Sequence, residues 1–78
     1  MRHLDVMWTD DNIAHLAEHD VSPWEAEEVL HDPEFSATSR RSGRPMAIGH
    51  TANGRRLAVI YDQIDPITVY PITAYDID

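Results

Sequence analysis

The sequence of 78 residues contains no cysteine and no lysine. Without cysteine, neither a disulfide framework nor a thiolate metal site can form, and a reducing compartment is the natural setting. No apolar run is long enough for a signal peptide or a membrane span, and three of the first five residues are polar. We therefore expect a cytoplasmic protein that has no contact with the membrane.

The chain is also short, and it has no internal repeat, linker or low-complexity segment. We expect one domain that covers residues 1–78. A domain of this size buries only about 60% of its unfolded surface and is marginally stable alone. A protein partner or a homodimer would help to stabilise it.

Basic residues are few, and they are concentrated in one part of the chain. Averaged over the whole molecule, the net charge of −8 argues against binding to polyanions. However, residues 1–34 hold ten acids and one arginine, residues 35–61 hold five arginines and no acid, and residues 62–78 hold four acids and no base. Arginine presents a planar fork that suits phosphate or carboxylate. The alternative is a flexible loop whose charges serve solubility.

Two helices are predicted in the first half. Thr9 or Asp10 caps a helix of about residues 10–19, in which Ile13, Leu16 and Ala17 have the spacing of one buried stripe. A second helix of about residues 23–31 is predicted by stronger signals. These are Ser22 as the N-cap, Pro23 at the first position, Glu25 completing a capping box, an apolar stripe of Ala26, Val29 and Leu30, and Asp32-Pro33 as the stop.

The rest of the chain has the pattern of strands. "LDVMW" (residues 4–8) predicts a short opening strand, and "MAIGHT" and "RRLAVIYD" flank Asn53-Gly54, which indicates a hairpin with a type I′ turn. Pro71 interrupts "ITVYPITAY", so it should lie at an edge or a bulge. The predicted fold class is α+β, in the order β-α-α followed by a three- or four-stranded antiparallel sheet.

The string "HLAEH" (residues 15–19) fits the H-x-x-E-H pattern of one class of zinc peptidases. His15 and His19 fall roughly opposite Ile13 on a helix, toward solvent, and a third protein ligand is missing. We therefore expect no metal site and no cofactor, and we interpret both histidines as exposed or helix-capping.

Two longer patterns carry a family resemblance. The first is W-x-x-x-N-I-x-x-x-x-x-H-x-V-S-x-x-E-A-x-x-V-x-x-D-P, from Trp8 to Pro33, and the second is R-P-M-A-I-G-H-T-x-x-G-R-x-L-x-V-I-Y, from Arg44 to Tyr61, followed by a terminal I-T-A. In this order and spacing the chain resembles BrnT-type toxins of the RelE/ParE superfamily. It departs from their usual His-Gly before the valine, where it has His19-Asp20.

The resemblance implies a RelE-like toxin of a type II toxin-antitoxin pair, which is a metal-independent endoribonuclease covered by a DNA-binding antitoxin. The ribose 2′-hydroxyl of the RNA would attack the adjacent phosphate, and arginines would stabilise the growing charge. Arg44 and Arg55 take the places of arginines in the pattern, whereas Tyr70 and Tyr75 replace basic residues, which predicts weakened activity. The expected catalytic residues are Arg44, Arg55 and Tyr75, and the expected substrate-binding residues are Arg40, Arg41, Arg56, His50 and Tyr70.

A second interpretation stays open: a non-catalytic interaction module or homodimer with the same fold. Arg44 and Arg55 can be solubility residues beside turns. His50 shares a strand face with Met46 and Ile48 and can be a satisfied sheet histidine. The remaining aromatic candidates are core, strand-packing or interface residues in this interpretation: Trp8, Trp24, Tyr61 and Tyr70.

Overall fold

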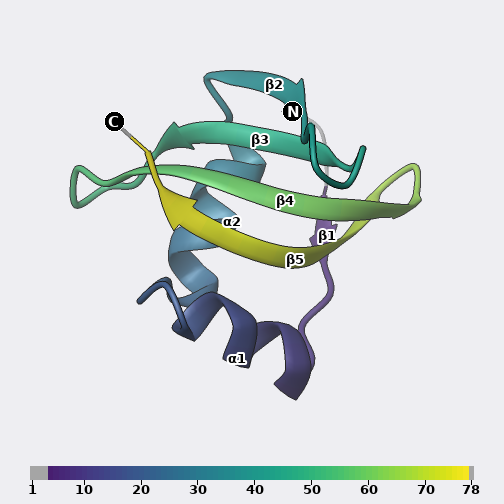
Figure 1. The fold of residues 1–78 in the computed structure, drawn as a ribbon, viewed down its shortest axis with the longest axis horizontal. Coiled ribbons are helices and arrows are strands. Elements are labelled where there is room, and N and C mark those ends of the chain that lie inside the picture. The colour runs from purple at the N-terminus through teal and green to yellow at the C-terminus, as the bar shows by residue number, and fades with distance from the viewer. Residues whose placement is uncertain (1–3, 78) are drawn as a thin grey trace.

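The structure, a computed structural model, describes residues 4–77 and contains two helices and a five-stranded mixed sheet (Figure 1). The elements are β1 (Asp5–Val6), α1 (Asp10–Ala17), α2 (Pro23–His31), β2 (Phe35–Thr38), β3 (Pro45–His50), β4 (Arg56–Asp65) and β5 (Thr68–Asp76). The strand order is β1-β5-β4-β3-β2. The predicted α+β class is confirmed, and β2 to β5 form the antiparallel run in its four-stranded version. The opening strand joins this run in parallel, beside β5.

Both helices begin at capping boxes. At α1, the hydroxyl of Thr9 accepts from the Asn12 N–H (3.3 Å), and the Asn12 side-chain oxygen accepts from the Thr9 N–H (2.8 Å). At α2, Ser22 and Glu25 make the same reciprocal pair, at 3.4 and 3.0 Å. Each box satisfies N–H groups that have no partner inside the helix. The predicted bounds of the second helix are confirmed.

The predicted buried stripe of α1 is wrong in two of its three members. Leu16 is buried, but Ile13 is 38% exposed and Ala17 is exposed. Asn12 takes the inward position instead, and its amide donates to the carbonyl of Pro71 in β5 (3.1 Å). Because a buried amide needs hydrogen-bond partners, this contact sets the rotation of α1 and turns Ile13 outward. An apolar periodicity does not contain that information.

The first helix also ends earlier than predicted, at Ala17. The Val21 N–H donates to the Leu16 carbonyl and the Asp20 N–H donates to the Ala17 carbonyl, both at 3.0 Å, which is the pattern of a Schellman motif. Asp20 adopts the left-handed conformation that this motif requires, with φ 59°. His19 therefore lies in the turn after the helix.

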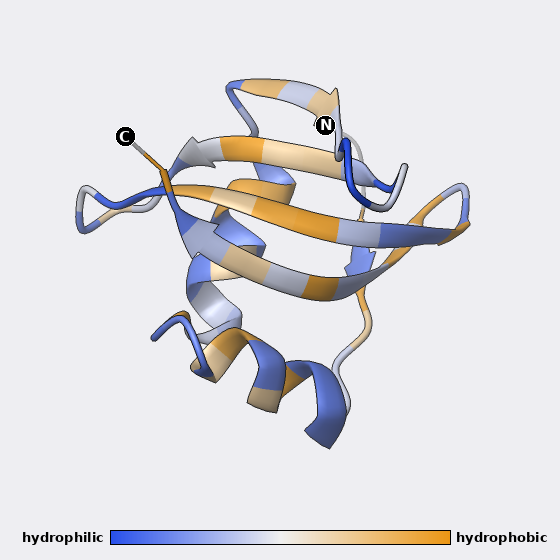
Figure 2. Ribbon diagram, in the orientation of Figure 1, coloured by the Kyte–Doolittle hydropathy of each residue, from blue (hydrophilic) through white to orange (hydrophobic). Residues whose placement is uncertain are grey.

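The helices pack on one face of the sheet, and the other face points toward the viewer in Figure 1. β4 is the central strand of the sheet, and its residues 57–59 are buried. The core joins the buried stripe of α2, Leu16 of α1 and the helix-facing side chains of β3, β4 and β5. Figure 2 shows this apolar band along β3 and β4, with a hydrophilic loop between β2 and β3. No helix in residues 4–77 has the length and hydropathy that a membrane span requires.

The hairpin between β3 and β4 is confirmed, but its predicted turn type is wrong. The Thr51 N–H donates to the Arg55 carbonyl (2.8 Å), and only Gly54 in the loop has positive φ (89°), whereas a type I′ turn needs two such residues. The extra residue makes a three-residue loop that ends in a left-handed glycine. Pro71 lies at the register shift where Tyr61 pairs with it, so the predicted bulge is confirmed.

Candidate nucleic-acid interface

The loop between β2 and β3 presents two neighbouring arginines, Arg40 and Arg41. It is closed by hydrogen bonds from the Ser39 N–H to the Arg44 carbonyl and from the Gly43 N–H to the Ser39 carbonyl, both 2.8 Å. Gly43 has φ 73°, a conformation that glycine adopts at little cost. Both arginine side chains are exposed, and neither has an ion pair or a hydrogen bond with another residue of the described range 4–77. The sequence thus builds a closed loop with two available guanidinium groups.

This loop forms one wall of a groove of about 680 Å³ on the sheet face that the helices leave open. We call it the arginine groove, and its lining residues are His19, Thr38, Ser39, Arg40, Arg41, Ser42, Arg44, Met46, Ile60, Ile72, Thr73 and Tyr75. Within the described part of the chain, the lining has three arginines and no carboxylate. The groove is therefore a basic site on a protein of net charge −8.

Arg44 is the least available of these three arginines. Its Nε donates to Oδ1 of Asp62 at 2.7 Å, and each side chain is 42% exposed. A half-exposed ion pair of this kind is screened by water and contributes little to stability. Arg44 can therefore exchange its carboxylate partner for a phosphate oxygen.

Tyr75 and His19 form the aromatic end of the arginine groove. Their ring centroids lie 6.2 Å apart at an interplanar angle of 58°, and the Tyr75 hydroxyl lies 3.9 Å from Sδ of Met46. His19 was not among the predicted site residues, because it was weighed only as a partner of His15 in a metal site. The sequence contained no signal for this position, because the predicted helix ran to about residue 19 and placed His19 on the same face as His15, whereas α1 ends at Ala17.

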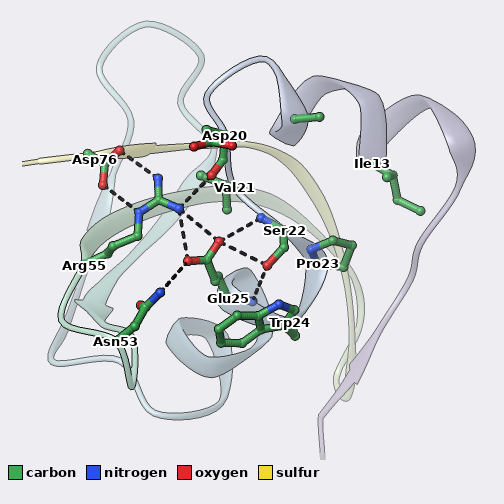
Figure 3. Close-up of a pocket in the computed structure, with 11 residues that line it drawn as sticks. Ile13, Asp20, Val21, Ser22, Pro23, Trp24, Glu25, Asn53, Arg55 and Asp76 are labelled. Atoms are coloured by element: carbon green, nitrogen blue, oxygen red, sulfur yellow. Dashed lines mark hydrogen bonds and ion pairs between the residues drawn. The ribbon is translucent and has the colours of Figure 1, made fainter.

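Arg55 belongs to a different structure from Arg44 and Tyr75. It lies at the helix-facing side of the sheet (Figure 3). Its Nε and Nη2 donate to the two carboxylate oxygens of Asp76 (3.0 and 2.8 Å), and its Nη1 donates to both oxygens of Glu25 (3.0 Å each). Nη1 also donates to the Asp20 carbonyl at 2.7 Å. The Arg55 side chain is 23% exposed. Its bonds tie the β3–β4 hairpin to the helix pair and to the end of β5.

The charged groups of this cluster shift one another's pKa values. Burial by itself raises the pKa of Glu25, but hydrogen bonds from Ser22, Arg55 and Asn53 outweigh it and hold the pKa below its ordinary value. The guanidinium of Arg55 likewise lowers the pKa of the Asp76 carboxyl. In turn, the hydrogen bond to Asp76 raises the pKa of Arg55, so Arg55 stays charged. Arg55 is a fixed cation whose donors are occupied.

Three predicted substrate-binding residues lie outside the arginine groove. His50 pairs with Glu34 through Nδ1. Arg56 lies over the ring of Phe35, with its Cζ 5.8 Å from the centroid, and approaches Glu34 at 4.0 Å. Tyr70 shares a hydrogen bond of 3.1 Å with the hydroxyl of Thr9 beside α1. The structure thus brings together Arg40, Arg41, Arg44 and Tyr75, and it does not bring Arg55, Arg56, His50 or Tyr70 to that groove.

Among residues 4–77, no group of three histidine, aspartate or glutamate side chains converges as a metal site would need. No protein-family model, curated protein or solved structure matches the chain. The chemistry of the site therefore follows from its own side chains: three guanidinium groups, one imidazole and one phenol around an apolar floor of Met46, Ile60 and Ile72.

Proposed function

We propose that this chain is a RelE-like toxin of a type II toxin-antitoxin pair, a cytoplasmic protein that binds single-stranded RNA in the arginine groove and cleaves it without a metal ion. The observation that carries the proposal is a groove lined by three arginines and no carboxylate on an otherwise acidic protein. Its partner in the cell is a DNA-binding antitoxin.

The shape and composition of the groove favour a single strand. Arg40, Arg41 and Arg44 supply donors for consecutive phosphates, and arginine forks match phosphate oxygens in pairs. The Tyr75 ring and the apolar floor beside it offer a surface on which an unpaired base can stack. In double-stranded RNA the bases stack on one another, so they cannot also stack on Tyr75 and the apolar floor.

Cleavage needs a base for the ribose 2′-hydroxyl, and His19 supplies the one imidazole among the lining residues of the arginine groove. In the proposed step, His19 removes the proton from the 2′-hydroxyl, the 2′-oxygen bonds to phosphorus, and the bond from phosphorus to the 5′-oxygen breaks. The leaving oxygen takes a proton from water, which leaves a 2′,3′-cyclic phosphate and a 5′-hydroxyl. The arginines stabilise the charge on the phosphoryl oxygens in the transition state.

A non-catalytic interaction module is the second candidate. It is favoured by the net charge of −8 and by tyrosine at positions 70 and 75. Tyrosine donates a hydrogen bond but carries no positive charge, so it stabilises a phosphorane-like transition state less than arginine does. In this case the arginine groove would hold an acidic peptide.

The test measures RNA binding and RNA cleavage separately. Binding of a short fluorescent single-stranded RNA is followed against salt concentration, and three phosphate contacts predict a slope of log affinity against log salt of about −2, at about −0.7 per contact. The double variant Arg40→Ala, Arg41→Ala should reduce the slope to about −0.7. Arg56→Ala is the matched control, because Arg56 lies outside the groove, and it should leave the slope unchanged.

Cleavage is assayed with excess chelator and product end-group analysis. Wild-type protein should give 2′,3′-cyclic phosphate ends, His19→Ala should abolish them, and Tyr75→Arg should increase both affinity and cleavage. Unchanged binding in the double arginine variant would refute the groove as the RNA site. RNA that binds but stays intact with both wild type and Tyr75→Arg would refute the nuclease and leave a binding module.

A further inference from the structure

The two helices leave apolar side chains exposed along a second groove, which no part of the RNA proposal uses. Trp24 is 55% exposed and Ile13 is 38% exposed, and both line an open groove of about 800 Å³. We call it the helical groove, and its lining residues are Ile13, Ala17, Asp20, Val21, Ser22, Pro23, Trp24, Glu25, Asn53, Arg55 and Asp76 (Figure 3). A tryptophan exposed to this extent beside other apolar side chains is typical of a protein-binding surface.

The rim of the helical groove is acidic. Its lining holds three carboxylates, Asp20, Glu25 and Asp76, and one cation, Arg55, which gives a local charge of −2. Arg55 already donates to Glu25, to Asp76 and to a backbone carbonyl, so it has little capacity to bind an anionic ligand. The surrounding helical layer adds to this negative charge, because residues 4–34 hold ten acids and neither arginine nor lysine.

The walls of the helical groove are already held in place. The capping box fixes the start of α2 beside Trp24, and the Schellman turn fixes Asp20 in its left-handed conformation. Arg55 joins both segments to Asp76 at the end of β5. A preformed surface loses little conformational entropy on binding, which favours affinity.

We propose that the helical groove binds a basic, amphipathic segment of a protein partner. The apolar side chains of the segment cover Trp24 and Ile13, and its lysine or arginine residues pair with the exposed carboxylates of Asp20 and Asp76. The surrounding negative charge repels nucleic acid, acidic peptides and anionic membranes. The proposal does not depend on RNA cleavage, because the helical groove and the arginine groove have no lining residue in common.

The two grooves nevertheless meet along the chain. Asp20 and Asp76 line the helical groove, and their neighbours His19 and Tyr75 line the arginine groove. In β5 the side chains of Tyr75 and Asp76 point to opposite faces of the sheet, so the two grooves use neighbouring residues but open on different faces.

The experiment uses the full chain and three synthetic peptides. One has leucines at i, i+3, i+4 and i+7 with lysines elsewhere, one has glutamate in place of every lysine, and one is a scrambled form of the lysine peptide without an apolar face. Binding is measured by calorimetry and mapped by backbone amide NMR shifts. The amphipathic lysine peptide should bind and shift the amides of Ile13, Asp20 and Trp24, and the glutamate peptide should not bind.

Variants then test the individual contacts. Trp24→Ala should weaken binding of the lysine peptide by about 30-fold, the typical effect of removing a tryptophan hot spot. Asp20→Asn, which keeps a residue that tolerates the left-handed turn, should weaken it by about threefold. Phe35→Ala is the control, because Phe35 is a similarly exposed aromatic residue (48%) on β2 that does not line the helical groove, and it should leave binding unchanged.

Three outcomes would overturn the proposal. They are equal binding of the lysine and glutamate peptides, shifts that map away from the helical groove, and equal effects of Trp24→Ala and Phe35→Ala. Because Trp24 is more than half exposed, its alanine variant should fold, and circular dichroism confirms this before binding is measured.

Discussion

Arg55 and the arginine pair in the β2–β3 loop are the same residue type within one short stretch of chain, yet their surroundings are opposite. Arg55 donates to two carboxylates and two backbone carbonyls, and only 23% of its side chain is exposed. Arg40 and Arg41 are exposed in a closed loop above a groove that is lined by no carboxylate in the described residues. The difference shows that position in the fold, and not charge in the sequence, decides which arginines are free to meet a ligand.

The largest expected effect is a difference in stability between variants of Arg55 and variants of the loop arginines. Arg55→Ala should lower the free energy of unfolding by about 2 kcal/mol, because it leaves the buried Glu25 without its cation and disconnects three segments. The double variant Arg40→Ala, Arg41→Ala should change it by less than about 0.5 kcal/mol, since neither side chain has an intramolecular partner in the described range. Urea unfolding of the three proteins measures both values. Equal losses of unfolding free energy in the two variants would contradict this difference between Arg55 and the loop arginines.

A smaller effect should appear in acid. The pKa values of Glu25 and Asp76 are lower in the folded state than in the unfolded state, so the unfolded state binds more protons as the pH falls. Their contribution to stability is complete above the ordinary Glu25 pKa of 4.5 and is lost as the pH falls through the lowered folded values. Unfolding curves measured from neutral pH to below pH 4.5 should show this loss in wild type and a weaker one in Arg55→Ala. The same loss of stability with falling pH in both proteins would show that Arg55 does not lower these pKa values.

The smallest expected effect concerns the turn that offers its carbonyl to Arg55. Asp20→Gly should raise the free energy of unfolding by about 0.5–1 kcal/mol, because glycine adopts the left-handed conformation without the steric cost of a side chain. The bond from Arg55 to the backbone carbonyl of residue 20 is kept in this variant. Asp20→Asn is the control and should be nearly neutral. The glycine variant also removes a rim charge of the helical groove, so a more stable protein should bind the lysine peptide less well.

Local chemistry explains why much of the fold could be predicted. Ser22, Pro23 and Glu25 start α2 through contacts within one helical turn, and Asp32-Pro33 ends it for reasons contained in two residues. The β3–β4 hairpin and the bulge at Pro71 also follow from short-range backbone preferences. The turn type of the hairpin was wrong because loop length depends on the pairing of the flanking strands.

The candidate site was less predictable, because its residues come from distant parts of the chain. Arg40, Arg41, Arg44 and Tyr75 were expected from the sequence and lie around one groove. His19 joins them only because α1 ends at Ala17 and the next turn brings the histidine ring near Tyr75. Arg55 was expected in one catalytic site with Arg44, but it lies at the base of the β3–β4 hairpin loop on the helical side, where its guanidinium donates to Glu25 and Asp76.

The sequence by itself determined the helix starts, the β3–β4 hairpin and the segregation of basic from acidic segments, because each depends on neighbouring residues or on simple periodicity. Only the tertiary structure decided the rotation of α1, the parallel pairing of β1 with β5, and the separation of one arginine-rich stretch between two grooves. The physical reason is that a buried amide such as that of Asn12 and a buried carboxylate such as that of Glu25 must find partners that are remote in sequence, and only the packed fold supplies them.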